Sequence, residues 1–436
     1  MREGPFSPPP RRRIVARGAI SDAAAPGAAM SEQVTHRPPH PVVYTVLYFP
    51  FGALGGFITV ALTFLATRHG LSITEGAFLT GASLMMNWLK WIWAPLVDTT
   101  LTPKRWYMIA TTASAIGVAA MASIPLGPET LTLLLAVITV ASLINTMVGM
   151  SIEAMMAQIT PPDQIGRVSA WFQAGNLGGA GIGGGLGLIL LQTLPELWMT
   201  GAIFGALFMA CCLALLALPP LPAEGHATSV GEATRQVFRD IAGMFKTRSG
   251  FLSSLLCFLP VGTGAAQSVL TQAEVAAHWG AGDTEVALVQ GWLNGIITAL
   301  GCFAGGWLCQ RFAPRAVYAG LGLTLAGVAV AMAASPAIVP MYLLWSTVYA
   351  LFVGFAYAAF TAIVLDAMGK GSAATKYTLY ATLSNFPIWW LGLLLGYTAD
   401  HYGAANMLNA EAALGVLGVL LFATVTSLVN RRPETA

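Results

Sequence analysis

Four ionisable residues are candidates for chemistry inside long apolar segments, where a charge is costly to hold: Lys90, Glu153, Glu274 and Asp366. An unpaired charge at the centre of a lipid bilayer costs at least about 2.5–3.5 kcal/mol, so such residues pair or serve an ion or solute path. At 1.5 Å per residue, Lys90 and Glu153 should both lie roughly 10–12 Å deep from the same end of their segments. A Lys90–Glu153 pair is therefore geometrically possible.

The Lys90–Glu153 pair has two interpretations that the residues leave open. It is either a structural ion pair or gate latch, or a working site in which Glu153 takes up a proton or contacts a cationic substrate group. In the second case Lys90 holds the charge of the site. Glu274 is expected at an outer interface. Asp366 lies nearer a segment end, where pairing with a neighbouring lysine or helix terminus is its expected role.

Polar amides and tyrosines inside the apolar segments are the candidates for lining a solute cavity. They are Tyr48, Asn87, Gln173, Asn176, Gln267, Asn294, Tyr357 and Asn385. Hydrogen bonding between helices competes with solute contact as the role of each amide. The sequence leaves that choice open.

Composition places these candidates in a membrane protein. Hydrophobic residues make up 56% of the 436 residues, charged residues only 9%, and the mean hydropathy is +0.70. A soluble domain carries roughly 25% charged residues, so this chain cannot face water all round. The five cysteines lie in apolar segments without metal-type spacing. No metal, cofactor or nucleic-acid partner is expected.

Twelve apolar runs are each long enough to cross the ~30 Å hydrocarbon core of a bilayer as a helix. The expected spans are Val42–Ala66, Thr74–Val97, Trp106–Ile124, Thr130–Ile159, Val168–Leu191, Leu197–Leu218, Phe251–Ala276, Thr284–Gln310, Ala316–Ala334, Ile338–Met368, Tyr377–Ala399 and Asn409–Val429. Runs of this length satisfy their backbone in lipid as helices. The predicted class is an all-α integral membrane protein with twelve transmembrane helices.

Basic residues give the expected orientation. With these spans, 19 of the 21 Lys and Arg residues fall on one side, which the positive-inside rule identifies as the cytoplasm. Both termini are therefore expected in the cytoplasm, and the expected location is the inner membrane of a bacterium. The Pro-, Ala- and Arg-rich start is expected to be a disordered tail, in which Met30 offers a second start of translation.

An internal repeat divides the chain. FPFG (Phe49–Gly52) matches LPVG (Leu259–Gly262) 210 positions later, and Asn176 matches Asn385 at nearly the same offset. A consistent register across several spans indicates two six-helix pseudo-repeats. The expected parts are a tail (1–41), an N-terminal bundle (42–218), a cytoplasmic linker (219–250), a C-terminal bundle (251–430) and a second tail (431–436).

The loop after the second expected span carries a family resemblance. WAPLVDTTLTPKRW (Trp93–Trp106) resembles the loop between spans two and three of the major facilitator superfamily, usually G-x-x-x-D-R-x-G-R-R. The resemblance implies that Asp98 braces the cytoplasmic ends of the two bundles, with Arg105 and Arg167 as candidate partners. Asp366 is expected to belong to the same cytoplasmic gate as Asp98, because it lies near the cytoplasmic end of its span. The spacing here is longer than usual, which leaves the pairing of Asp98 open.

Within that superfamily, the chain most resembles the AmpG-like branch of muropeptide permeases and acetyl-CoA-transporter-like proteins. WAPLVD, the IEAM around Glu153 and the run DQIGRVSAWFQAGNLGG carry this resemblance. It implies a muropeptide-like, siderophore-like or acyl-CoA-like solute, in no firm order.

The fifth expected span is unusually rich in glycine. Small residues four apart let helix backbones approach closely, and here they are Gly175, Gly179, Gly183 and Gly187. The span is expected to pack against a helix of the other bundle and to slide or rock there. The same run contains G-x-G-x-x-G, but inside an apolar span this pattern does not indicate nucleotide binding.

The function predicted is secondary active transport of a polar or amphiphilic small solute by alternating access, coupled to protons through Glu153. The expected partners are the solute, protons and the lipid bilayer, and the chain is expected to act as a monomer. A polytopic membrane enzyme is the first alternative, but no His-rich or Ser/His/Asp cluster supports it. A non-transporting sensor is the second, and it would need a larger soluble module than the central linker.

Overall fold

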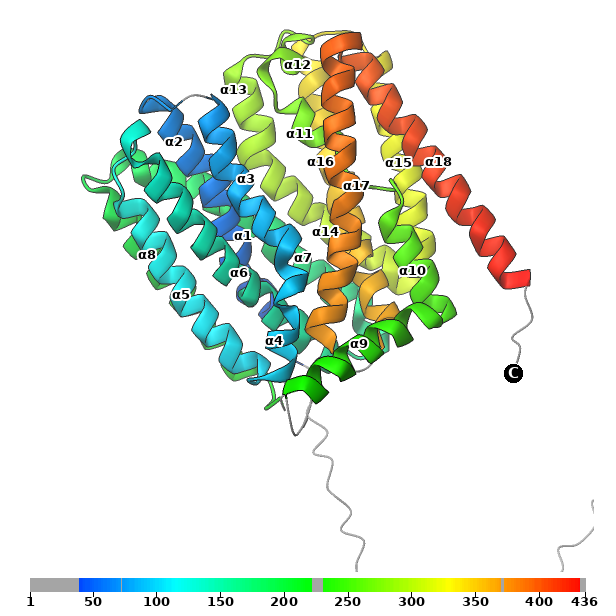
Figure 1. Cartoon of the computed structure of the whole chain (residues 1–436). Coiled ribbons are helices and arrows are strands. Elements are labelled where there is room, and N and C mark those ends of the chain that lie inside the picture. The colour runs from blue at the N-terminus through cyan, green and yellow to red at the C-terminus, as the bar shows by residue number, and fades with distance from the viewer. Residues whose placement is uncertain (1–38, 72, 222–229, 370–371, 432–436) are drawn as a thin grey trace, which may run out of the picture. The chain divides into compact units, whose positions relative to one another are not determined.

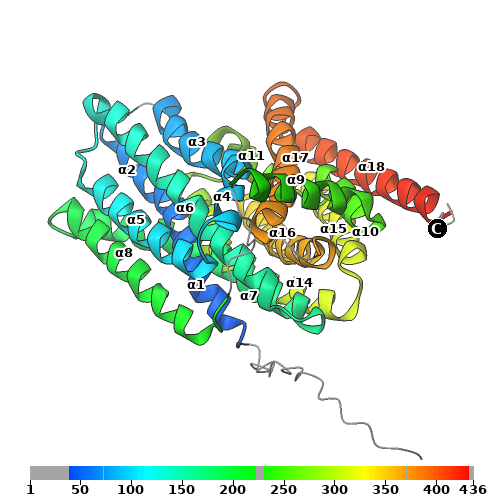
Figure 2. The ribbon, with the colours of Figure 1, turned by 60° about the horizontal axis from the view of Figure 1, so that its bottom comes forward.

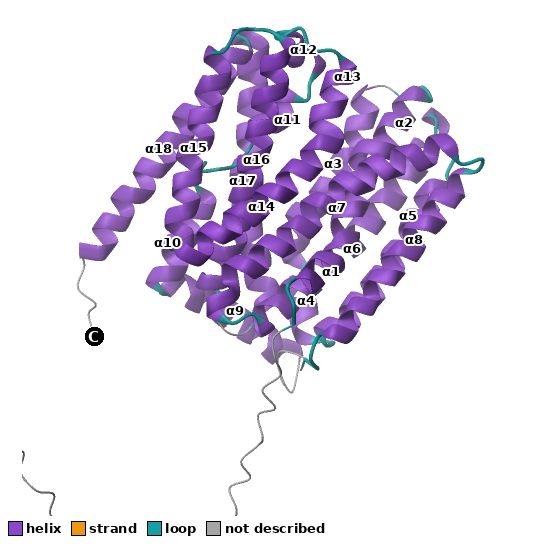
Figure 3. Ribbon diagram, turned by 180° about the vertical axis from the view of Figure 1, so that it is seen from behind, coloured by secondary structure: helices purple, strands orange, loops and turns teal. Residues whose placement is uncertain are grey.

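The computed structural model describes residues 39–71, 73–221, 230–369 and 372–431, which belong to one compact unit. Residues 1–38 of the expected tail, with Met30, lie outside the described residues. Every regular element in the described ranges is a helix, as Figure 3 shows. The expected all-α class is therefore confirmed for this part of the chain.

The helices before residue 220 form what we call the N-terminal set. They are α1 (Val42–Gly56), the π-helix η1 (Phe57–Leu62), α2 (Thr63–Arg68), α3 (Ile73–Leu89), the 3₁₀ turn η2 (Lys90–Ile92), α4 (Ala94–Thr99), α5 (Pro103–Ser123), η3 (Pro128–Thr130), α6 (Leu131–Ile159), η4 (Pro162–Gln164), α7 (Ile165–Thr193), α8 (Leu197–Cys211) and η5 (Cys212–Ala217).

The helices after residue 247 form the C-terminal set (Figure 1). They are α10 (Arg248–Phe258), α11 (Ala266–Leu270), α12 (Ala273–Ala277), α13 (Asp283–Val286), the π-helix η6 (Ala287–Trp292), α14 (Leu293–Arg311), α15 (Pro314–Ala334), α16 (Val339–Ala367), α17 (Ala373–Tyr402) and α18 (Ala404–Arg431).

Nine helical runs of the described chain are long and apolar enough to cross a membrane, and they coincide with nine of the twelve expected spans. The other three expected spans are helical as well. Two of them, α3–α4 and α10–α12, are interrupted, and α17 is continuous but richer in polar residues. Interruption and polarity thus separate three spans from the rest, and these three contribute to the sites described below.

The two Pro-x-Gly sequences behave differently. α1 runs through Pro50 without a break, whereas the matching Pro260 lies in a non-helical stretch between α10 and α11. Gly262 and Gly264 have φ of +61° and +66°, a left-handed backbone that favours glycine. The seventh expected span is therefore not one helix, because proline and two left-handed residues together stop it.

The expected linker 219–250 is more ordered than a loop. It contains the 17-residue helix α9 (Val230–Lys246), which lies across one end of the bundle near α4 and α10 in Figure 1. The Ser372 hydroxyl donates a hydrogen bond to Asp240 Oδ2 of α9 at 2.8 Å. We call this end of the molecule the α9 end.

The glycines of α7 pack against α1, which corrects the expectation that they face the other bundle. A Cβ at Gly179 would lie 2.9 Å from the Phe49 carbonyl oxygen of α1, and one at Gly187 would lie 2.7 Å from the Phe57 ring of η1, which continues α1. Gly175 and Gly183 likewise meet the backbone of α1, at Thr45 and Ala53.

A different row of α7 glycines faces the C-terminal set. A Cβ at Gly181 would lie 2.8 Å from the Cα of Gly295 on α14, and Gly166 meets Gly306. In Figure 2, α7 lies between α1 and α14. A four-residue spacing predicts close packing but does not identify the neighbour, and with glycine on two faces both faces are used.

The α1–α7 contact predicts a contrast between two glycines of α1. A methyl group at Gly52 would collide with the Asn176 carbonyl oxygen, whereas one at Gly55 would meet nothing within 4 Å. Overpacking of this kind costs about 1–3 kcal/mol. We expect Gly52→Ala to lower the free energy of unfolding by that amount and Gly55→Ala to leave it unchanged or slightly higher, since alanine is the better helix former.

Thermal unfolding in detergent, followed by tryptophan fluorescence, measures both glycine variants. Equal melting temperatures for the two would contradict the close approach of α1 and α7.

Candidate functional site

A single buried carboxylate on α6 joins four parts of the chain. Glu153 is 1% exposed, and the Lys90 ammonium group donates a hydrogen bond to its Oε1 at 3.1 Å. The Tyr48 hydroxyl on α1 lies 3.5 Å from Oε1, and the Thr378 hydroxyl on α17 lies 3.5 Å from Oε2. The pair that the sequence allowed is therefore formed, and Thr378 adds a contact from the C-terminal set.

Lys90 reaches Glu153 because the helix around it is interrupted. The residue begins η2, the 3₁₀ turn between α3 and α4, and α4 has Pro95 in its first turn. Lys90 is 5% exposed, so both charges of the pair are buried. Breaking such a pair by removing one partner leaves a charge without compensation, which is strongly destabilising.

Aromatic rings close the space beside the ion pair. The Tyr48 ring stacks on Phe172 of α7 with centroids 4.0 Å apart, and on Phe51 at 4.9 Å. Phe172 in turn meets Tyr377 of α17 edge-on at 6.0 Å. These rings surround the ion pair with apolar groups, and low polarity strengthens its attraction.

The predicted amides of α7 form a second contact between the two sets of helices. Gln173 donates to the Thr361 hydroxyl of α16 at 2.8 Å, and that hydroxyl lies 3.0 Å from the Tyr377 hydroxyl. The Asn176 side-chain amide donates to the Gln173 side-chain oxygen Oε1 at 3.1 Å. Gln173 and Asn176 thus take the helix-bonding role that competed with solute contact.

The remaining cavity candidates divide into two groups. Asn87 and Asn294 donate to carbonyl oxygens of their own helical runs, at Ser83 and Gln290. Asn385 is half-buried on α17.

Gln267 and Tyr357 instead line a cavity of about 270 Å³ in the C-terminal set. Its wall is completed by α11, α16 and α17, with Thr263, Val353 and Ile388 among the lining residues. This cavity is large enough for part of a small solute.

Asp98 accepts hydrogen bonds from the first residues of α17, which are therefore partners of this acid. Its Oδ2 accepts hydrogen bonds from the Thr375 backbone N–H at 2.8 Å and the Thr375 hydroxyl at 2.6 Å, and Oδ1 accepts from the Ala374 N–H at 3.0 Å. An acid at a helix N-terminus satisfies free N–H groups and interacts favourably with the helix dipole. Asp98 on α4 therefore binds the N-terminal set to the C-terminal set at the α9 end.

The arginines proposed for Asp98 lie elsewhere. Arg105 and Arg167 are exposed, and Arg167 contacts the His40 ring at 3.0 Å. The expected arginine partners are thus replaced by backbone and hydroxyl donors of α17, which the loop motif does not encode. Asp366 is the repeat-mate of Glu153, because LDAM (Leu365–Met368) repeats IEAM (Ile152–Met155). It is exposed on α16, and the side chain of Glu274 lies outside the described residues.

Sequence reasoning missed several residues of these contacts. Threonine is common in apolar helices, so the sequence does not single out Thr361, Thr375 and Thr378. Their hydrogen-bond partners in the structure distinguish them from the other threonines. Glu411 of α18 was also missed, because it lies three residues into its expected span and resembles an interfacial acid. In the structure it is buried and accepts a hydrogen bond from the Tyr349 hydroxyl at 2.6 Å.

Comparisons with known proteins agree with this architecture. Residues 44–390 match the model of the Major Facilitator Superfamily. No curated protein matches the sequence at a significant level.

Solved structures of transporters have a similar fold. The chain resembles an E. coli fucose:proton symporter, with 17% identity, a TM-score of 0.65 and coverage of 88% of this chain and 98% of that one. A human organic anion transporter, MFSD10, has 16% identity and a TM-score of 0.65 over 88% of this chain and 100% of its own. A bacterial homologue of the iron transporter ferroportin, in an outward-facing state, has 13% identity and a TM-score of 0.60 over 90% and 99%. At such identities the likeness shows a shared fold.

The buried ion pair predicts that neutralising one partner destabilises the protein and that neutralising the second partner restores stability. Lys90→Met leaves the Glu153 carboxylate without its counter-charge, and we expect the free energy of unfolding to fall by about 3–5 kcal/mol. In Lys90→Met/Glu153→Gln no charge remains, so most of the stability should return. Thermal unfolding of the single and double variants measures this. A double variant as unstable as Lys90→Met would contradict the pairing.

The Asp98 contact predicts opening at the α9 end when it is removed. Hydrogen bonds to a charged group contribute about 1.5–3 kcal/mol each, so Asp98→Ala should raise the exchange rates of nearby amides by at least about tenfold. Hydrogen–deuterium exchange should show this at the start of α17 and also around Gly166, where α7 meets α14. The control is Asp366→Asn, which removes an exposed acid at the same end. Faster exchange in α17 alone would make Asp98 a local helix cap.

Proposed function

The chain belongs to the Major Facilitator Superfamily and is a multi-pass membrane transporter, not an enzyme, and on that premise we propose that it couples solute movement to protons at Glu153. The solute is polar or amphiphilic, and residues 42–218 and 251–430 are the two bundles that move relative to each other. Both termini face the cytoplasm of a bacterial cell in this proposal, since the basic residues gather on that side.

The observation that carries the proposal is that Glu153 contacts both sets of helices from a buried position. Its carboxylate accepts from Lys90 of the N-terminal set and lies within 3.5 Å of the Thr378 hydroxyl of the C-terminal set. Protonation of Glu153 would remove the charge that Lys90 faces. A buried ammonium group without a counter-charge is costly, so proton uptake favours a state in which Lys90 meets water or an anionic solute group.

In alternating access, a state that is open at the α9 end would expose Lys90 to water or solute. In the structure the two sets are bonded together at the α9 end, through Asp98 to Thr375 and through Gln173 to Thr361. Loss of the Glu153–Thr378 contact weakens the same closure. Proton binding and opening of the α9 end are thereby linked through α17, which Glu153 contacts at Thr378 and Asp98 contacts at Thr375.

The solute class follows from chemistry and resemblance. Lys90 becomes the free cation of the site when Glu153 is protonated, so an anionic group is the complementary partner. Muropeptide-like and acyl-CoA-like solutes carry carboxylate or phosphate groups, and siderophore-like solutes are retained as the third class. This assignment continues the AmpG-like resemblance of the IEAM and WAPLVD runs.

The test is uptake into proteoliposomes under an imposed proton gradient, with an anhydro-muropeptide, a siderophore and acetyl-CoA as solutes. We expect Glu153→Gln to reduce gradient-driven uptake at least about tenfold, since it cannot release a proton, while solute exchange without a gradient persists. The control Asp366→Asn neutralises the exposed repeat-mate and should transport like the wild type.

Gradient-driven uptake by Glu153→Gln at the wild-type rate would refute coupling at Glu153. Failure of the wild type to move any of the three solutes would refute the proposed solute classes.

A further inference from the structure

A second buried carboxylate lies in the C-terminal set, remote in sequence from the ion pair. Glu411 of α18 is 9% exposed. Its Oε1 accepts hydrogen bonds from the Tyr349 hydroxyl at 2.6 Å and from the Ala266 N–H at 3.1 Å. Its Oε2 is buried and has no hydrogen-bond partner among the described residues. Half of this carboxylate is therefore unpartnered.

No ion pair joins Glu411 to a cationic side chain in the described part of the chain. An uncompensated charge inside a membrane costs at least about 2.5–3.5 kcal/mol. A cation or a proton at Oε2 would remove this cost.

The broken helix beside Glu411 supplies further oxygen atoms. The Pro260 carbonyl follows the C-terminal end of α10 and accepts no backbone hydrogen bond within the described residues. A helix C-terminus is electrostatically favourable for a cation. Non-helical backbone at membrane depth is tolerated where it lines a cavity, and unwound carbonyls coordinate Na⁺ in membrane transporters.

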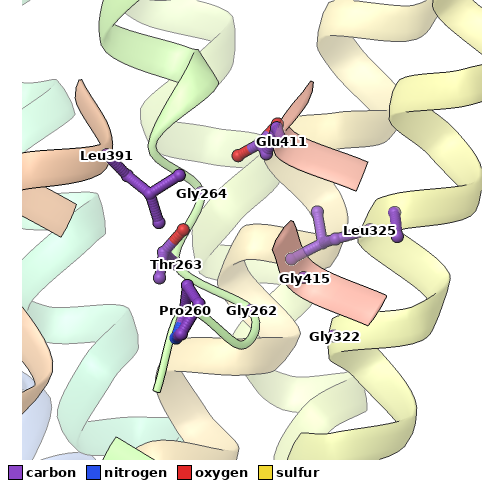
Figure 4. A pocket seen from close by; sticks show the side chains of 10 residues that line it. Pro260, Gly262, Thr263, Gly264, Gly322, Leu325, Leu391, Glu411 and Gly415 are labelled. Carbon is purple, nitrogen blue, oxygen red and sulfur yellow. The ribbon is translucent and has the colours of Figure 1, made fainter. Parts of the chain in front are cut away.

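A small cavity connects these groups. It has a volume of about 10 Å³ and is lined by Glu411, Gly415 and residues of the α10–α11 loop, including Pro260 and Thr263. This is close to the space that one water-sized particle requires. Figure 4 shows the Glu411 side chain extending from α18 toward that loop, with the Thr263 hydroxyl on the same side.

We propose that this cavity, the Glu411 cavity, binds one Na⁺ ion with Glu411 as its counter-charge. The ligands are the free Glu411 oxygen, the Thr263 hydroxyl and carbonyl oxygens of the broken loop. One carboxylate neutralises one monovalent ion, whereas a divalent ion would leave a net charge inside the membrane. The site is independent of proton coupling at Glu153.

Binding of ²²Na⁺ to the purified full chain tests the proposal directly. The wild type should bind about one ion per chain, as the space for one particle implies. Glu411→Gln keeps an acceptor for Ala266 and Tyr349 but removes the charge, and it should abolish binding. Gly415→Ala keeps the carboxylate and adds a methyl group 3.8 Å from the Pro260 carbonyl oxygen. It should weaken binding at least about tenfold by filling the cavity.

Two variants serve as controls and should bind like the wild type. Gly320→Ala adds a methyl group on α15 with nothing within 4 Å, and Asp366→Asn removes an exposed acid of the same set of helices. Melting temperatures in NaCl and choline chloride give a second measurement, with a Na⁺-dependent rise in every variant except Glu411→Gln and Gly415→Ala.

Absence of Na⁺ binding by the wild type, or undiminished binding by Glu411→Gln, would overturn the proposal. A melting temperature that follows pH but not Na⁺ would also overturn it, because a proton alone would then be the partner of Glu411.

Discussion

The cost of a buried charge is the constraint on which this structure depends. Glu153 lies on a helix that crosses the protein interior, and its ionised form is tolerable because Lys90 meets it at 3.1 Å. That contact requires the interruption between α3 and α4, which turns Lys90 inward. It also brings α17 into the same site through Thr378. Glu153 thus contacts both the interrupted second span, through Lys90, and the C-terminal set of helices, through Thr378.

Close backbone approach is the second constraint, and α7 provides it on two faces. Gly175, Gly179 and Gly183 bring it against α1, Gly187 brings it against η1, and Gly166 and Gly181 bring it against α14. Aromatic pairs accompany both contacts, Tyr48 with Phe172 on the α1 side and Trp171 with Phe303 on the α14 side. The contacts that do hold the two sets together at the α9 end are polar, as at Asp98 and Gln173. Polar contacts at a glycine-lined interface suit a transporter that must close and reopen.

The two pseudo-repeats have diverged in the places where chemistry is possible. The acid of the first repeat, Glu153, is buried and paired, whereas its counterpart Asp366 is exposed. The Pro-x-Gly of the first repeat lies within a continuous α1, whereas that of the second lies in the non-helical stretch beside Glu411 that separates α10 from α11. Each repeat therefore has a buried glutamate, Glu153 or Glu411, but at different helices and with different neighbours. The proposed proton and Na⁺ sites follow this asymmetry.

The sequence by itself determined the class of the molecule and allowed one ion pair within it. Apolar runs, basic loops and the repeat are local or periodic signals, so they indicated membrane helices and a possible Lys90–Glu153 pair without coordinates. Only the tertiary structure decided the partners. Asp98 binds N–H groups of α17 rather than an arginine, and the α7 glycines at a four-residue spacing face α1. Every residue except proline has a backbone N–H group, so the sequence cannot show which of them will bind Asp98. A row of glycines likewise predicts close packing but does not identify the neighbouring helix. Glu411 became recognisable only when Tyr349 and the broken helix were found beside it, because burial is a property of the packed chain and not of the residue.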